Sequence, residues 1–104
     1  MIIASADEIA EKKIVETLGL VRGNTIRARH IGKDILAVLR NIAGGEIQEY
    51  TKMMAESREQ SLDRMAEEAE KLGADAIVGV RFTTTSMMQG AAELLVYGTA
   101  VKLE

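Results

Sequence analysis

The chain has 104 residues, a formal net charge of −3 at pH 7, 47% hydrophobic residues and 28% charged residues, values that are ordinary for one soluble globular domain. The absence of cysteine excludes disulfides, thiolate metal sites and cysteine nucleophiles. The slightly acidic balance, with only two Tyr and one Phe, argues against a general nucleic-acid-binding protein.

The N-terminus lacks the basic region and the long apolar region of a secretory signal. No apolar run in the chain is long enough to span a bilayer. We therefore expect a cytoplasmic protein without membrane or nucleic-acid partners, folded as a single domain over residues 1–104.

The first part of the chain predicts two strands. Residues 2–4 form a short apolar stretch typical of an edge strand, and residues 12–29 have the pattern of a long strand. Apolar residues occur on both faces of this long strand, so neither face is expected to lie fully in water. Gly19 and Gly23 share a face, where the missing side chains permit a bulge or the close approach of another backbone.

Two helices are predicted next. Asp34 is a typical N-cap for a short helix that ends at Gly44-Gly45, and a long helix of about 40 Å follows from Glu46 to Leu72. The short helix has a broad apolar face made of Ile35, Leu36, Val38, Leu39 and Ile42. The helical period assigns to the inner face of the long helix Ile47, Tyr50, Met54, either Ser57 or Arg58, Ser61, Leu62, Met65, Ala69 and Leu72.

The last part of the chain predicts a hairpin: a strand at residues 76–85, a polar turn at 86–90 and a strand at 93–103. The fold class is therefore α+β, a two-layer subunit of β-α-β-β type whose antiparallel-rich sheet is covered on one face by a short and a long helix. Two helices cover only one face of this sheet, and both faces carry apolar residues. We expect a second copy of the chain to cover the other face, which gives a homo-oligomer.

Four stretches, in this order and spacing over nearly the whole chain, resemble the YbjQ-like family of small bacterial and archaeal proteins. They are Leu18 to Gly23; Gly44-Gly45-Glu46 with Tyr50, Arg58 and Met65; Gly73 to Phe82; and Tyr97 to Val101. The run Glu11-Lys12-Lys13 departs from the family pattern, in which a glycine-containing entry to the first long strand is expected. The resemblance implies a ring-shaped homopentamer, the label "putative heavy-metal-binding" and no established reaction.

The residues themselves give the metal label little support. Soft metals prefer thiolate, thioether or imidazole ligands, and a closed site needs about three or four of them. His30 is the single histidine and lies among basic residues, so we favour a surface imidazole. Met87 and Met88, in the predicted turn, are better candidates for an exposed contact. A metal cofactor is thus implied only by the family label, although one ligand per subunit around a symmetry axis would also build a site.

Basic residues suggest a rival hypothesis. Arg27 and Arg29 share a face of the long strand, and repeated around a ring they would attract a small anionic ligand to the subunit boundaries. The alternative is a charged edge that prevents strands from aggregating. Glu46, Tyr50 and Arg58 allow a polar pocket near the glycine pair, but we favour helix N-terminal electrostatics and a structural ion pair.

Catalysis has little support in the sequence. No serine has a visible base partner, and Gly44-Gly45 lacks the lysine and hydroxyl of a phosphate-binding loop. We therefore expect a homo-oligomeric module and not an enzyme. Three functions stay open: heavy-metal binding, binding of a small anion at subunit boundaries, and a purely structural assembly.

Overall fold

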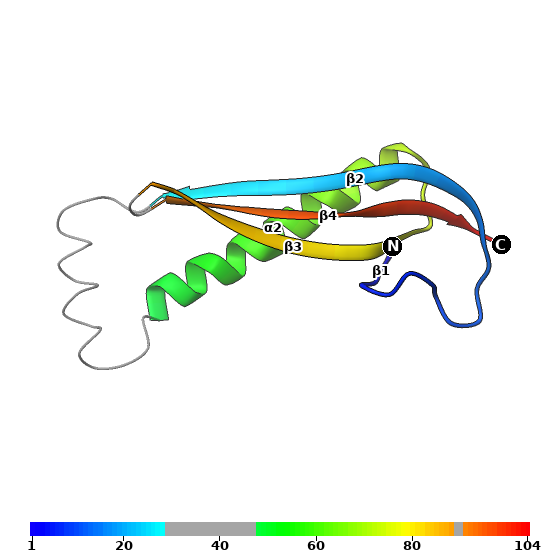
Figure 1. The fold of residues 1–104 in the computed structure, drawn as a ribbon, viewed down its shortest axis with the longest axis horizontal. Coiled ribbons are helices and arrows are strands. Elements are labelled where there is room, and N and C mark those ends of the chain that lie inside the picture. Colours follow the sequence, from blue (N-terminus) through cyan, green and yellow to red (C-terminus); the bar gives the residue numbers. More distant parts are fainter. Residues whose placement is uncertain (29–47, 89–90) are drawn as a thin grey trace.

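A computed structural model describes residues 1–28, 48–88 and 91–104. Its elements are β1 (Ile2–Ile3), β2 (Ile14–Ala28), α2 (Gln48–Lys71), β3 (Ala76–Met88) and β4 (Ala91–Leu103), as Figure 1 shows. The predicted α+β class and the order of the long elements are confirmed. The predicted short helix at residues 34–43 lies outside the described residues. Within the described part of the chain, no helix is long and apolar enough to cross a membrane.

The strands form one sheet in the order β1-β3-β4-β2. β3 and β2 both run antiparallel to β4, whereas β1 is parallel to β3 through Ile2↔Ala76 and Ile3↔Ile77. β2 pairs with β4 over its whole length, from Ile14↔Leu103 to Ala28↔Ala91. β2 is therefore one edge of the described sheet, and the expected short strand β1 forms part of the other edge.

Two glycines of β2 have the structural roles that the sequence suggested. A Cβ atom on Gly23 would lie 2.1 Å from the carbonyl oxygen of Ser61 and 2.6 Å from the backbone nitrogen of Met65, so only glycine allows α2 to pack this closely. Gly19 has a φ of +128° and lies at a register shift between β2 and β4. The close backbone approach and the bulge are both confirmed.

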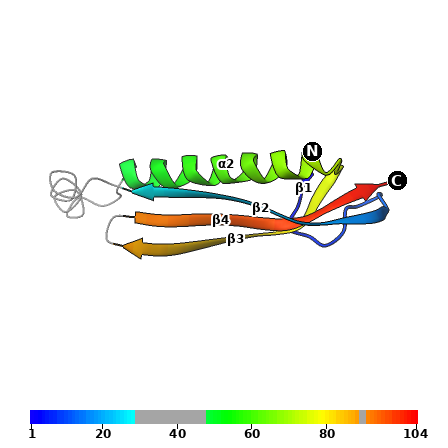
Figure 2. The same ribbon diagram turned by 90° about the horizontal axis from the view of Figure 1, so that it is seen from above.

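The helix lies over the β2 side of the sheet. α2 contacts β2 most, β4 less and β3 least, and Figure 2 shows β3 on the far side of the sheet from it. The residues of α2 that face the sheet lie four positions apart and are buried, namely Ser57, Ser61, Met65 and Ala69. The core between helix and sheet consists of Val21, Met65, Ala69, Ile77, Val80, Val96 and Ala100.

Two details of the predicted inner face are settled by this packing. Ser57 and not Arg58 faces the sheet, because Ser57 is buried and Arg58 is exposed. Leu72 was assigned inward but is 47% exposed. The helix ends at Lys71, and Leu72 belongs to the turn in which the Leu72 amide donates to the Ala69 carbonyl at 3.1 Å. The helical period therefore no longer applies to Leu72.

The N-terminal segment covers one end of the sheet on the face opposite α2. There Ile9 and Ile14 pack on a second buried cluster of Ala76, Val78 and Val101, with Leu103 beside it. The segment is held by backbone hydrogen bonds from Gly79 to Ala6 (2.9 Å) and from Val80 to Ala4 (3.1 Å). At this end the face is therefore covered by the chain's own N-terminal segment and not by the second copy that was expected from the sequence.

The hairpin between β3 and β4 is longer than predicted. β3 continues to Met88, which pairs with Ala91, so residues 86–88 are strand and the predicted turn at 86–90 is wrong in this part. The cross-strand ladder explains the difference, because Ser86 pairs with Ala92 and Thr85 with Glu93. Three successive threonines before Ser86 favour the extended conformation that this ladder needs.

Candidate functional site

The face opposite α2 carries large apolar side chains beyond the reach of the N-terminal segment. Leu20 is 67% exposed, Ile26 is 57% exposed and Tyr97 is 38% exposed, and Leu95 is half-buried beside them. Strand pairing places all four on one face, because Arg22 pairs with Tyr97 while Val21 and Gly23 face the helix. We call Leu20, Ile26, Leu95 and Tyr97 the open face.

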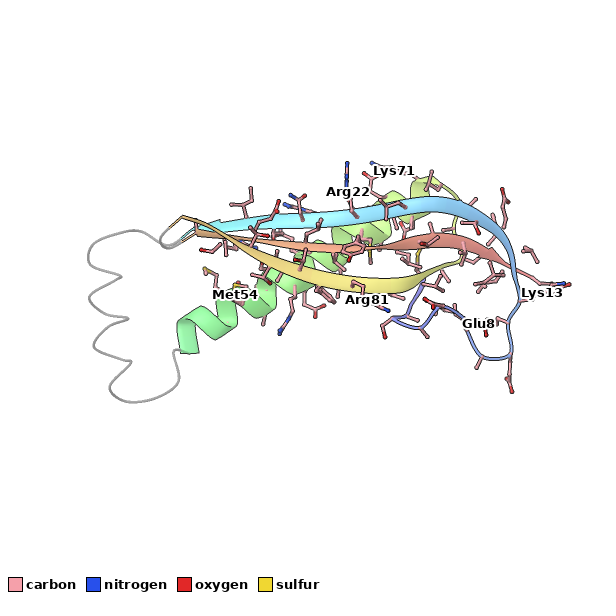
Figure 3. The ribbon with its side chains drawn as sticks, in the orientation of Figure 1. Glu8, Lys13, Arg22, Met54, Lys71 and Arg81 are labelled. Atoms are coloured by element: carbon pink, nitrogen blue, oxygen red, sulfur yellow. The ribbon has the colours of Figure 1, made fainter. Side chains whose placement is uncertain are left out.

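Polar residues are interspersed among these apolar ones. The Asn24 side-chain amide donates to the Glu93 carboxylate at 3.2 Å across β2 and β4. Arg22 is exposed beside Tyr97, and Figure 3 shows it projecting from β2 on the side of the sheet away from β3. An apolar centre with polar neighbours is the composition typical of a protein–protein contact surface.

The covered face contains a buried cluster of hydroxyl groups, which the sequence analysis did not find as a cluster. Thr25 of β2 and Ser57 and Ser61 of α2 are all buried. The Thr25 hydroxyl lies within hydrogen-bond distance of both serine hydroxyls and 3.3 Å from the Ser57 carbonyl oxygen, and the Ser61 hydroxyl lies 3.3 Å from the Leu94 carbonyl oxygen. The three hydroxyl protons are shared among these four contacts. These bonds satisfy buried polar groups and fix how α2 sits on the sheet.

Arg27 lies at the end of this same seam between β2 and α2. Its side chain is half-buried and a terminal guanidinium nitrogen donates to the Gln60 side-chain oxygen. Its Nε atom is buried and has no hydrogen-bond partner among the described residues. Arg27 therefore faces the helix and does not lie on the open face.

The other predicted site residues are not brought together by the described structure. Arg58 is exposed on α2. Tyr50 belongs to α2 and Met87 and Met88 to β3, but their side chains lie outside the described part. Arg29, His30 and Glu46 also lie outside the described residues. The pocket expected from Glu46, Tyr50 and Arg58 stays a prediction.

The described residues do not offer a metal site. They contain no group of three or more histidine, cysteine, aspartate or glutamate side chains placed to hold a metal ion. Met87 and Met88 were expected in a turn, but they belong to strand β3. The side chains of Met87 and Met88 lie outside the described part of the chain, so a site that uses them stays a prediction.

A groove at the edge of β3 is a second feature that sequence reasoning missed. Its walls come from the end of β1 and the residues after it, from β3 and from α2: Ile3, Ala4, Ser5, Leu62, Val80, Arg81 and Phe82. The groove measures about 440 Å³, and Phe82 beside it is 45% exposed. Phe82, the only aromatic residue of β3, was the sequence signal for this groove. Its exposure, however, results from α2 lying away from β3.

The comparison with family models and the comparison with known protein sequences identify the same family. The YbjQ family model, described as "Putative heavy-metal-binding", matches residues 1–104. Proteins named "UPF0145 protein" are similar over nearly their whole length. The one from Methanosarcina acetivorans is 59% identical over 99% of this chain and 97% of its own, and the one from Archaeoglobus fulgidus is 58% identical over 99% and 95%. A relative from Dehalococcoides mccartyi is 56% identical over the full length of both chains.

A solved structure supports the fold. The crystal structure of a protein of unknown function from Pediococcus pentosaceus, assigned to the DUF74 family, has a TM-score of 0.70 over 100% of this chain and 98% of its own. The two sequences are 16% identical, so the likeness concerns the fold alone.

Proposed function

The chain belongs to the YbjQ family, whose description is "Putative heavy-metal-binding", and from this premise we propose that it is a non-enzymatic subunit of a homo-oligomer in the cytoplasm. The observation that carries the proposal is the open face, where Leu20 and Ile26 are each more than half exposed. A ring of five copies is the assembly that the family resemblance implies.

Physical chemistry favours a partner for this face. Burying a Leu or Ile side chain contributes about 1.5–3 kcal/mol, so several such residues on one surface give a substantial gain on association. The sheet also has only one described helix to cover it, and that helix lies on the opposite side. A neighbouring copy is the simplest partner, because most soluble oligomers are built from identical chains.

The mass of the native protein tests the proposal. We expect light scattering after gel filtration to give about five times the chain mass of 11.3 kDa at micromolar concentration. Leu20→Asp and Ile26→Asp are each expected to shift the protein to smaller species, because a carboxylate would have to be buried at the contact.

Leu72→Asp is the matched control, since Leu72 is also about half exposed but lies in the turn after α2. It should leave the native mass unchanged. A wild-type monomer at micromolar concentration would overturn the proposal, and so would equal behaviour of the open-face variants and this control.

A second function, binding of a small anion, is favoured by the Nε atom of Arg27, which is buried without a hydrogen-bond partner among the described residues. Burial of a charged donor without a partner is costly, and an anion would relieve that cost. Gln60 holds one side of the guanidinium and so fixes its orientation.

Inorganic phosphate is a suitable probe for this second function, titrated at low and high ionic strength by calorimetry. We expect saturable binding that salt weakens, and a loss of at least tenfold in affinity for Arg27→Ala or Arg29→Ala. Arg22→Ala is the control, because Arg22 belongs to the same strand but is exposed on the other face. Indifference of the phosphate affinity to both Arg27→Ala and Arg29→Ala would remove the hypothesis.

Heavy-metal binding comes from the family description and not from the described side chains. It requires His30, Met87 or Met88, or ligands contributed by several copies. Elemental analysis of the purified protein and titration with Zn²⁺ and Cu⁺ test it directly. Bound metal that is lost in His30→Ala or in a Met87→Leu/Met88→Leu variant would support it, and metal-free protein that ignores both ions would exclude it.

A further inference from the structure

The groove lies at the same edge of β3 with which β1 pairs, farther along β3. β1 pairs with β3 only at Ala76 and Ile77. The N-terminal segment then stays bonded to β3 as far as Val80, because the Gly79 amide donates to the Ala6 carbonyl and the Val80 amide donates to the Ala4 carbonyl. From Phe82 to Met88 no strand in the described residues pairs with this edge of β3. Backbone N–H and C=O groups on a free edge are ready to pair with an added strand.

The side chains around this position define what an added strand would carry. Residues along a strand alternate between two faces, so one side chain near its end would point to the helix side of the sheet. On that side the groove is lined by Ile3, Leu62, Val80 and Phe82, which are all apolar. Phe82 pairs with the buried Val96, which puts Phe82 on the helix side as well. An apolar side chain therefore fits there.

Arg81 lines the groove and contributes a positive charge to it. One terminal nitrogen of its guanidinium donates to the Ser5 carbonyl at 2.8 Å and to the Val80 carbonyl at 2.9 Å. These bonds anchor the exposed side chain at the β3 edge next to the N-terminal segment, as Figure 3 shows. Guanidinium has five N–H donors in a planar fork, so an anchored arginine still presents donors to a carboxylate.

We propose that this edge is a strand-addition site for the C-terminal end of an extended peptide with an apolar last residue. The peptide runs antiparallel to β3, entering at Met88 and ending beside Phe82, where the edge bonded to the N-terminal segment begins. Its carboxylate meets the Arg81 guanidinium, and its last side chain enters the apolar groove. A peptide in the opposite orientation would place its α-ammonium group or an uncharged part of its chain next to Arg81. The ammonium group would be repelled by the guanidinium, and an uncharged chain would leave the guanidinium without an anionic partner. Main-chain pairing gives affinity and the groove gives selectivity, as in other strand-addition sites.

Fluorescence anisotropy with the full chain tests the proposal. The probe is a six-residue peptide, Gly-Ser-Thr-Val-Thr-Leu, labelled at its N-terminus and made with either a free carboxylate or a C-terminal amide. We expect saturable binding of the acid and at least tenfold weaker binding of the amide. This comparison uses only the wild-type protein, so it does not depend on a variant that folds.

Variants locate the site. Arg81→Gln and Phe82→Asp should each weaken binding of the acid by at least tenfold, whereas Arg22→Gln, an exposed arginine on the other edge strand, should not change it. Hydrogen exchange should slow at the backbone amides of residues 82–88 when the acid binds. Equal binding of acid and amide, no binding of either, or an equal loss in Arg22→Gln would each overturn the proposal. So would competition by decanoate with the same affinity as the peptide, since decanoate has no backbone to pair.

Discussion

Leu20 and Val21 are neighbours in β2, yet Val21 is 3% exposed against α2 while Leu20 is 67% exposed on the open face. On the covered face, small residues meet small residues. Gly23 lies against the backbone of α2, and Thr25 bonds to Ser57 and Ser61. On the open face, the large apolar side chains have no described neighbour above them. Over β2 the covered face is thus completed within one chain, and the open face is the one on which the proposed assembly depends.

Gly23→Val is the substitution on the covered face for which we expect the largest loss of stability. The atoms next to Gly23 are the backbone of α2, which moves only if the whole helix shifts, so we expect a loss of about 4 kcal/mol in the free energy of unfolding. Urea unfolding followed by circular dichroism measures it. The control is Asn24→Val, one residue along on the other face, which should change stability by less than about 0.5 kcal/mol. A loss below about 1 kcal/mol for Gly23→Val would mean that the close packing of α2 is wrong.

The next largest effect is expected for Met65→Ala. Met65 is fully buried in the core between α2 and the sheet, and its truncation should cost about 3 kcal/mol. Leu72→Ala removes a side chain of similar size from an exposed position and should cost much less. Similar losses for the two variants in urea unfolding would show that the inner face of α2 is assigned incorrectly.

A smaller effect is expected for Thr25→Val, which keeps the shape of the side chain but removes its hydroxyl. Ser57 and Ser61 would each lose a buried partner, with an expected loss of about 1–2 kcal/mol. Because the three hydroxyls form one network, the loss in Thr25→Val/Ser61→Ala should be smaller than the sum of the two single losses. Strict additivity in the double-mutant cycle would contradict a coupled network.

The smallest effect on the subunit itself is expected for Ile26→Thr on the open face. Ile26 is 57% exposed, so the free energy of unfolding of the isolated subunit should change by less than about 0.5 kcal/mol. If this face is a contact between copies, the same change should lower the melting temperature more at high protein concentration than at low concentration. A melting temperature of wild-type protein that is independent of concentration would argue against such a contact.

Much of the fold could be predicted because its local patterns agree with one another. The long strand, the long helix and the hairpin each follow from periodicity, and Gly19 and Gly23 were expected to permit a bulge or a close backbone approach. The errors lie at element ends. Leu72 follows the end of α2, and β3 runs past the predicted turn because pairing with β4 extends it. Local sequence does not determine where a ladder stops, since this depends on the partner strand.

The candidate sites were less predictable than the fold. Arg27 was expected beside Arg29 on a boundary, but its contact with Gln60 depends on the sideways position of α2 over β2. The choice between Ser57 and Arg58 stayed open for the same reason, because the two neighbours differ by one step around the helix. The groove at Phe82 exists only because α2 lies away from β3. The lateral position of a helix on a sheet is a tertiary property, and a single glycine such as Gly23 has a large part in fixing it.

The order of the strands also determines when the sheet forms during synthesis of the chain. β4 joins β2 to β3, and it is synthesised after the other described strands. β2 is made early but pairs with residues near the other end of the chain, as Ile14 does with Leu103. β3 and β4 are a hairpin and close rapidly, whereas β2 closes a loop of most of the chain. We therefore expect the hairpin to form first and β2 to remain unpaired, with its apolar residues exposed, until β4 has been synthesised.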